Sequence, residues 1–193
     1  MCSLIAELNQ LKQEFYEEKG KNSLFKKKQK EECARRISSK YRIEELAQAT
    51  IFNVPDTNRV FIDYTIFKLF VNTNNIGYVV NYIIFNIKET IRKYGNFIVD
   101  FNLDTFTVSA AERYKDAILL YSEQCNNNEN KNTDFVMSMV CMNIYNTPSV
   151  IDMIKLILKP LTDPTVYSKI KSYSKEETEA IFAESPFVRS STY

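Results

Sequence analysis

The sequence of 193 residues contains no histidine and only three glycines, and each shortage excludes a class of site. Without histidine, the chain lacks the usual general base, the Ser–His and Cys–His nucleophile pairs, and the commonest zinc ligand. Three glycines, Gly20, Gly77 and Gly95, cannot build a glycine-rich phosphate loop. We therefore predict that the protein is not an enzyme and holds no metal and no cofactor. Asp100 and Asp104 are the only pair that we would consider as acid and base.

Long apolar runs and paired cysteines are also missing. No stretch contains the roughly 20 uncharged apolar residues that a membrane-spanning helix needs, and the opening MCSLIAELNQ soon becomes polar, unlike a signal peptide. The cysteines are scattered without a C-x-x-C motif, so we expect reduced thiols rather than disulfides or a metal site. They are Cys2, Cys33, Cys125 and Cys141. These features favour a cytoplasmic protein.

The periodicity of apolar residues divides the chain into two parts. Residues 1–50 show no strand pattern, and apolar residues at helical spacing predict a basic N-terminal helical hairpin. Residues 51–193 alternate between strands and helices, which predicts an α/β domain with a mainly parallel sheet and helices on its faces. Strands are expected at 59–72, 96–103, 134–145 and 169–174, and helices at 76–94, 109–125, 149–159 and from 174 to about 183.

Positive charge is concentrated between Lys19 and Arg42. Ten basic and two acidic residues give this segment about +8, while the whole chain carries +1. One interpretation is a solvated helix face. Another is a surface that attracts anionic lipid headgroups, with Lys26, Lys27, Lys28 and Lys30 as the membrane contacts. Binding of nucleic acid is the least favoured interpretation, because stacking aromatic residues are sparse between the charges.

The segment from Asn143 to Lys171 is the most informative part of the sequence. An apolar strand leads into Asn146, Thr147 and Pro148, where the threonine can cap a helix and the proline suits its first position. The helix at 149–159, which prolines then end, carries one narrow polar stripe. The remaining residues are apolar, and one packing partner cannot cover so wide an apolar surface. Either the helix lies in the core between two layers, or its excess faces a pocket, a lipid or a partner.

The succession of apolar strand, N-T-P, amphiphilic helix, K-P-L-T-D-P and S-K-I resembles the CRAL-TRIO lipid-binding domain of phosphatidylinositol/phosphatidylcholine transfer proteins. The resemblance implies a mobile gate helix that closes over one phospholipid or another hydrophobic small molecule. The gate residues would be Ile151, Ile154, Ile157 and Leu158. In the phosphoinositide-binding branch, hydroxyls of the strand-to-helix passage and the lysine of S-K-I contact the headgroup phosphate. Here these positions are Thr107, Ser109 and Lys169.

The resemblance implies that the protein binds a phospholipid or other hydrophobic ligand, and can transfer it, without catalysis. Such a carrier would be cytoplasmic and peripheral to membranes, and it would visit an anionic membrane surface transiently. The alternative is a structural or protein-interaction module that kept the fold and lost the lipid pocket, with a partner protein in place of the ligand.

Overall fold

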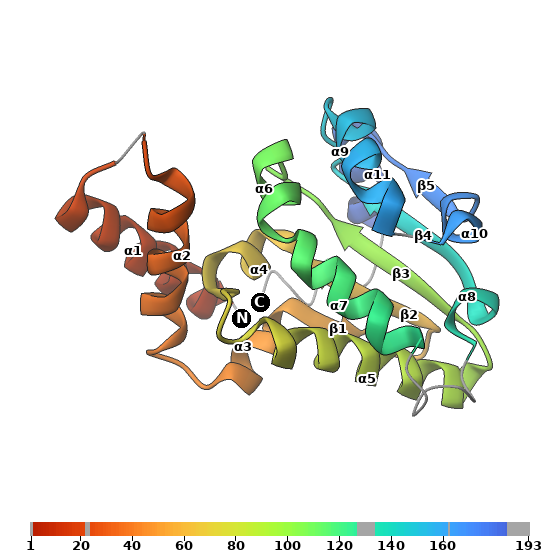
Figure 1. Cartoon of the computed structure of the whole chain (residues 1–193). Helices are drawn as coiled ribbons and strands as arrows, with labels where there is room; N and C mark the ends of the chain where they lie inside the picture. The colour runs from red at the N-terminus through yellow and green to blue at the C-terminus, as the bar shows by residue number, and fades with distance from the viewer. Residues whose placement is uncertain (1, 22–23, 127–133, 162, 185–193) are drawn as a thin grey trace.

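The computed structural model describes residues 2–21, 24–126, 134–161 and 163–184, which build a sheet flanked by helices (Figure 1). Within these residues the sheet has five strands, in the order β1-β2-β3-β4-β5. β2 to β5 are mutually parallel, and β1 pairs with β2 in the antiparallel direction. The strands are β1 (Ile51–Asn53), β2 (Arg59–Asp63), β3 (Phe97–Asn102), β4 (Met139–Tyr145) and β5 (Ile170–Ser172). This arrangement confirms the predicted α/β class with a mainly parallel sheet.

One face of the sheet carries the main hydrophobic core. Because the parallel strands follow one another in chain order, right-handed crossovers place their connecting helices on the same face. Figure 1 shows α5 (Ile76–Tyr94) and α7 (Lys115–Asn126) side by side against this face. Val60, Ile62 and Val99 project from the sheet into the same buried cluster as Val80 and Ile87 of α5.

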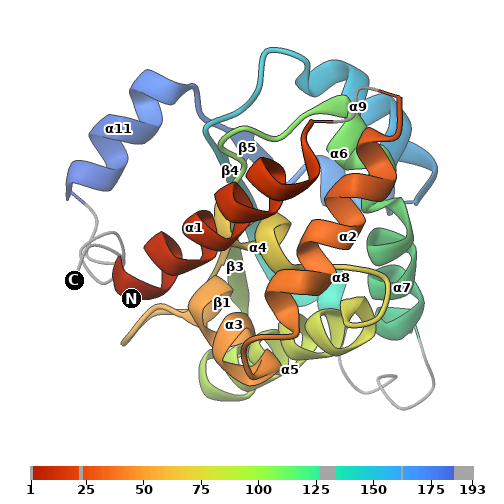
Figure 2. The same ribbon diagram turned by 90° about the vertical axis from the view of Figure 1, so that its left-hand side faces the viewer.

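The opposite face is covered by α11 (Lys175–Glu184), which Figure 2 shows on the other side of the sheet from α7. Phe61 and Tyr145 form a second buried cluster there, with Phe182 of α11 packed against both rings. The predicted capping box begins this helix: Ser174 N donates to Glu177 Oε2 at 2.7 Å, and Glu177 N donates to Ser174 Oγ at 3.2 Å.

The N-terminal residues form a helix pair, α1 (Cys2–Lys19) and α2 (Lys26–Ser38), followed by α3 (Ile43–Thr50). Both helices of the pair contact α4 (Tyr64–Phe70). Their buried side chains join the main core of the sheet domain, and they are Leu8, Phe15, Cys33 and Ile37. The helix pair is therefore packed onto the carboxyl ends of the strands rather than folded around a core of its own.

The strand expected over residues 59–72 is wrong beyond Asp63. The chain turns into α4 because the carboxylate of Asp63 accepts hydrogen bonds from the backbone N of Thr65 at 2.8 Å and from its hydroxyl at 2.7 Å. The strand expected over 134–145 is likewise shortened. Asp134 caps a short helix, α8 (Phe135–Ser138), by accepting from Met137 N at 2.9 Å, and β4 follows.

Two predicted helix starts are also corrected. α6 (Val108–Arg113) is capped by Thr107, whose hydroxyl accepts from Ala110 N at 3.2 Å, and not by Ser109. α9 (Ile151–Leu158) begins two residues later than expected. Thr147 does not cap it, since its hydroxyl donates to Ile144 O at 3.0 Å. α9 continues into the short helix η2 (Lys159–Leu161), and α10 (Pro164–Tyr167) precedes β5.

Candidate functional site: a basic pocket

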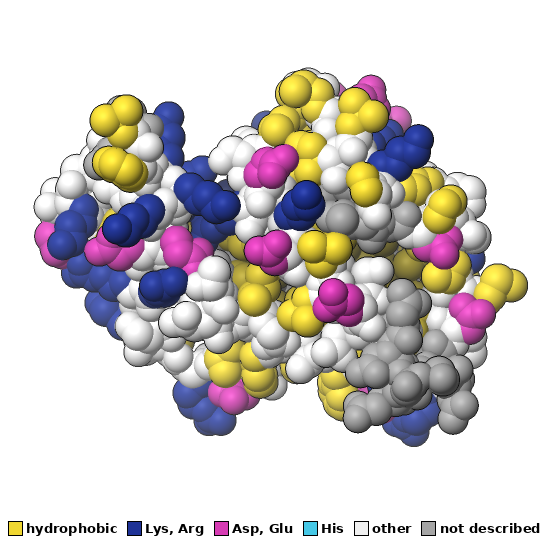
Figure 3. Space-filling view, in the orientation of Figure 1, with side chains coloured by type: hydrophobic (Ala, Val, Ile, Leu, Met, Phe, Trp, Pro, Cys, Tyr) yellow, Lys and Arg dark blue, Asp and Glu magenta, His cyan; other side chains and the backbone are white. Residues whose placement is uncertain are grey.

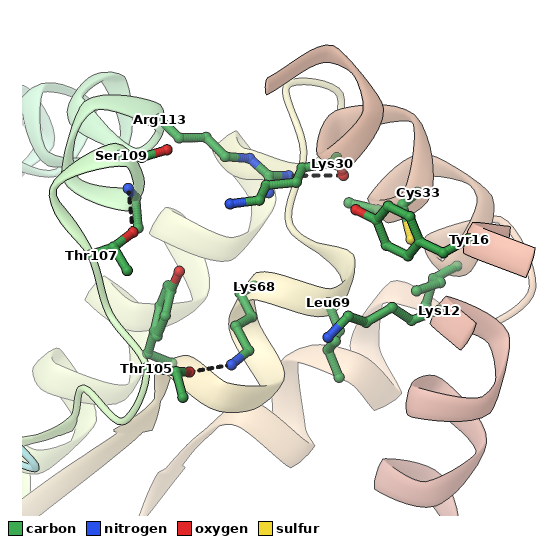
Figure 4. Close-up of a pocket in the computed structure, with 14 residues that line it drawn as sticks. Lys12, Tyr16, Lys30, Cys33, Lys68, Leu69, Thr105, Thr107, Ser109 and Arg113 are labelled. Atoms are coloured by element: carbon green, nitrogen blue, oxygen red, sulfur yellow. Dashed lines mark hydrogen bonds between the residues drawn. The ribbon is translucent and has the colours of Figure 1, made fainter. Parts of the chain in front are cut away.

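A cavity of about 220 Å³ lies between the N-terminal helix pair and the carboxyl ends of β2 and β3 (Figure 4). In parallel α/β sheets, ligands bind outside the carboxyl ends of the strands, so this is where a site is expected. α1 and α2 form one side of the pocket, and α4, the loop after β3 and α6 form the other. The polar and charged lining residues are Lys12, Tyr16, Lys30, Cys33, Tyr64, Lys68, Thr105, Thr107, Ser109 and Arg113.

The described wall of this basic pocket carries four cations and no carboxylate. Lys12, Lys68 and Arg113 extend toward the same space from helices on opposite sides (Figure 4). Burial lowers the pKa of Lys68, and the positive charge of Lys12 lowers it further, while nearby Asp104 acts in the opposite direction. The cations therefore repel one another, and an anion among them would relieve this repulsion.

Arg113 is largely buried, with 10% of its side chain exposed. One terminal nitrogen donates to Val71 O at 3.1 Å and to Lys30 O at 3.4 Å, and it lies 3.4 Å from a carboxylate oxygen of Glu31. Its Nε is buried and has no hydrogen-bond partner among the described residues. A buried donor without a partner costs about 1–3 kcal/mol, and native proteins rarely contain one. The guanidinium thus has an unused donor in the wall of a cationic cavity.

Hydroxyl groups complete the pocket. The structure brings the predicted Thr107 and Ser109 into the same wall, and it adds Thr105, which sequence reasoning missed. Thr105 accepts a hydrogen bond from the ammonium of Lys68. Lys12, Lys68 and Arg113 were also missed, because they lie on three different helices and share no spacing pattern that could have connected them.

Lys169 does not join the other two predicted phosphate contacts. Its ammonium donates to Val136 O at 2.6 Å and to Met139 O at 2.7 Å, at the amino end of β4. Thr107 and Ser109 follow the carboxyl end of β3, and the two strands run parallel. The three residues therefore do not form one site, and Lys169 holds the backbone between α8 and β4.

The predicted gate residues take different positions on α9. Ile154 is buried, Ile151 and Ile157 are partly buried, and the side chain of Leu158 lies outside the described residues. Much of the apolar excess is exposed to solvent, at Met153 and Leu156. No α9 residue is in the described wall of the basic pocket, or of a second cavity of about 200 Å³ between the β1–β2 turn and the end of α5.

The four lysines predicted as membrane contacts are exposed, but they do not all lie on one surface. Lys26, Lys27 and Lys28 begin α2 and lie outside the described pocket wall. Lys30, one turn further on, lines the basic pocket.

Asp100 is fixed in a polar network on the sheet face that α11 covers. Its carboxylate accepts from Arg59 at 2.7 and 2.8 Å, from Asn143 at 2.8 Å and from the Tyr145 hydroxyl at 3.1 Å. Burial and the charge of Asp100 raise the pKa of Tyr145. Because the carboxylate is completely buried among these donors, Asp100 faces no open space from which it could take a proton as a general base. Within the described ranges, no cluster of three or more histidine, cysteine or carboxylate side chains could hold a metal.

The described cysteines Cys33, Cys125 and Cys141 are free thiols, and the side chain of Cys2 lies outside the described residues. Among the described helices, none has both the length and the apolar character needed to cross a bilayer. No model of a known protein family matches the chain, and a comparison with curated proteins finds no match either.

Proposed function

We propose that the protein binds a phosphate-bearing lipid, with the headgroup in the basic pocket, and holds it without transforming it. One observation carries the proposal: Lys12, Lys30, Lys68 and Arg113 converge on a cavity whose described wall has no acidic residue. Charge-assisted hydrogen bonds from ammonium and guanidinium groups to phosphate are among the strongest in proteins. The hydroxyls of Thr107 and Ser109 line the same pocket and add neutral donors to a phosphate oxygen.

The size and the apolar wall of the pocket fit a headgroup and the first part of a lipid. A volume of about 220 Å³ is below the roughly 300–1,000 Å³ of pockets for drug-sized ligands, so acyl chains need further space. Cys33, Ala34 and Ile37 give the pocket an apolar side on α2. An anionic molecule with an apolar extension matches this combination better than a free phosphate does.

The CRAL-TRIO resemblance suggests where the acyl chains enter. α6 contributes Ser109 and Arg113 to the pocket and contacts α9, which lies beyond it in Figure 1. In the proposed loaded state, α9 moves as the gate, and chains occupy the space that Ile154 now fills. Ile151 and Ile157 then line the chains beside Ile154, and Leu158 is the fourth gate residue that the resemblance implies.

A protein-interaction module without a lipid is the second candidate. The observation in its favour is that Ile154 is buried and that neither described cavity is large enough for a whole phospholipid. In that case the cations of the pocket would receive an anionic segment of a partner.

Native mass spectrometry and lipid extraction of the purified protein test the proposal. We expect about one phospholipid per chain, and binding of a soluble short-chain phosphatidic acid by delipidated protein. Lys12→Gln and Lys68→Gln should each weaken that binding roughly tenfold or more, because a hydrogen bond to a charged group contributes about 1.5–3 kcal/mol. Lys40→Gln, an exposed lysine outside the described pocket wall, should leave it unchanged.

Two results would contradict the proposal. A folded, lipid-free protein that takes up no short-chain phosphatidic acid would favour the interaction module. Binding of inorganic phosphate as tightly as the lipid, through the same two lysines, would identify a free phosphate compound as the ligand.

A further inference from the structure

The residues directly before α2 are an exposed apolar pair beside a run of lysines. Leu24 is 86% exposed and Phe25 is 63% exposed, and Lys26, Lys27 and Lys28 follow as exposed residues. Apolar surface of this size is unfavourable in water, since each exposed square ångström costs roughly 25 cal/mol relative to burial. Apolar tips flanked by lysines are typical of surfaces that enter the headgroup region of a bilayer.

A second apolar projection lies at the same end of the molecule. Met153 and Leu156, three residues apart on α9, are 56% and 71% exposed. Figures 1 and 2 both show the start of α2 and α9 toward the top of the molecule. Figure 3 shows hydrophobic side chains near the start of α2 and near α9, with Lys and Arg side chains around the start of α2. The two projections therefore lie at the same end of the molecule, and α6 lies between them in Figure 1.

The lysines at this end of the molecule favour an anionic partner. The first turn of α2 presents three lysines, α9 adds Lys155, and η2 adds Lys159. Lys155 lies 3.4 Å from Asp152. A nucleic acid backbone would attract these lysines, but its phosphates would make no apolar contact with Leu24 and Phe25. An anionic bilayer attracts the lysines through its headgroups and accepts the apolar side chains between them.

We propose that this end of the protein is a two-point docking surface for a bilayer that contains anionic lipid. The first point is Leu24 to Lys28, and the second is Met153 and Leu156. Docking through these points turns the region around α6 toward the membrane. The surface excludes Lys12 and Lys68, so it can be tested separately from the function proposed for the basic pocket.

The absence of tryptophan from the chain allows a direct test. Phe25→Trp and Leu156→Trp each introduce a single fluorophore at an exposed site. Phe85→Trp is the matched control, because Phe85 is 57% exposed and lies on α5 at the other end of the molecule (Figure 1). On vesicles of phosphatidylcholine and phosphatidylserine, emission from the first two variants should shift to shorter wavelength and be quenched by brominated acyl chains. Emission from Phe85→Trp should not change.

Neutralising the lysines tests the charge component. The triple change Lys26→Gln, Lys27→Gln and Lys28→Gln should weaken vesicle binding about 100-fold, at about five-fold for each lysine. Rising salt should release the wild-type protein, since charge attraction is screened within roughly 10 Å at 0.1 M. The pocket variants Lys12→Gln and Lys68→Gln should keep vesicle binding, which separates a failure of docking from a failure of the pocket.

Three outcomes would overturn the docking surface. The first is an unchanged Phe25→Trp spectrum on vesicles that bind the protein. The second is equal sedimentation of the triple variant and the wild type with anionic vesicles. The third is tighter binding of duplex DNA than of vesicles at equal salt, which would assign the lysines to nucleic acid. Insertion at Phe25 without insertion at Leu156 would remove α9 from the surface.

Discussion

The carboxylate of Asp100 is completely buried, and four hydrogen bonds end on it. Arg59 supplies two of them as a bidentate pair, and it joins β2 to the neighbouring strand β3. A buried charge is tolerated only when it is paired, because transfer of an unpaired carboxylate out of water is very unfavourable. This single residue therefore sets the polar centre of a sheet face whose surroundings are aromatic.

Replacement of Arg59 by methionine should lower the free energy of unfolding by about 3 kcal/mol, the lower end for a broken buried pair, since Asn143 and Tyr145 still donate to Asp100. Urea denaturation measures the loss. The exposed pair of Arg92 and Glu89, 2.7 Å apart, is the control. Arg92→Met should leave the free energy of unfolding nearly unchanged, because water screens an exposed ion pair. Equal losses for the two variants would show that burial of Asp100 does not control the effect.

At the scale of the element, α9 is held at its start by a contact that is distant in sequence. Asn146 adopts a left-handed conformation with φ of 52°, which makes the turn after β4. Its backbone N donates to the hydroxyl of Thr178 on α11 at 2.8 Å, and that hydroxyl donates to Ser174 O at 2.6 Å. The turn before the proposed gate is therefore fixed to the helix on the far face of the sheet, while α9 itself exposes much of its apolar surface.

The two faces of α9 should respond differently to truncation. Ile154→Ala should lower the free energy of unfolding by about 2–5 kcal/mol, because a buried isoleucine leaves a cavity. Leu156→Ala should change it by about 0.5 kcal/mol or less, as expected for an exposed side chain. Thermal or urea denaturation of both variants provides the measurement. A large loss for Leu156→Ala would mean that another surface covers this face in solution.

At the scale of the whole molecule, Glu31 connects the N-terminal helix pair to the sheet domain. Its carboxylate accepts from the backbone N of Thr73 at 2.7 Å and from the Thr73 hydroxyl at 2.9 Å, and it lies 3.4 Å from Arg113. Burial by itself raises the pKa of Glu31. The hydrogen bonds from Thr73 and the charges of Arg113 and Arg35 outweigh burial, so its pKa lies below the ordinary 4.5.

A carboxyl whose pKa is lowered by folding stabilises the native state above its ordinary pKa and loses that contribution as pH falls through the folded value. Attachment of the helix pair should therefore weaken as pH falls below 4.5. Hydrogen exchange should show faster opening of α1 and α2 relative to α5 in acid. Glu31→Gln should loosen the pair already at neutral pH and flatten this dependence.

The exposed neighbour Glu32 provides the matched control for that experiment. Glu32→Gln should retain the acid response of the wild type. If Glu31→Gln and Glu32→Gln both retained the acid response of the wild type, the helix pair would be held by its apolar contacts alone, and Glu31 would not be the titrating group.

The sequence alone determined those features that depend on local physics. Apolar periodicity and strand–helix alternation predicted the mainly parallel sheet, because burial of one face requires the same spacing wherever the element lies. Gly95 ends α5 with φ of 76°, and Ser174 with Glu177 begins α11, as their local chemistry requires. The strand predicted over Tyr64 to Phe70 was wrong, because β-branched and aromatic residues fit a buried strand and a buried helix alike. The cap at Asp63 favours the helix.

Which residues line the basic pocket, and therefore its charge, depends on packing between distant parts of the chain. Lys12, Lys30, Lys68 and Arg113 lie on four helices, and packing of the helix pair against α4 brings them together. No local signal marks such a group, because a lysine at a pocket and a lysine on a solvated face have the same helical spacing. Tertiary structure also separates Lys169 from Thr107 and Ser109. Pairing across the sheet fixes the direction of the strands, and this places Lys169 and the two hydroxyl residues at opposite ends of parallel strands.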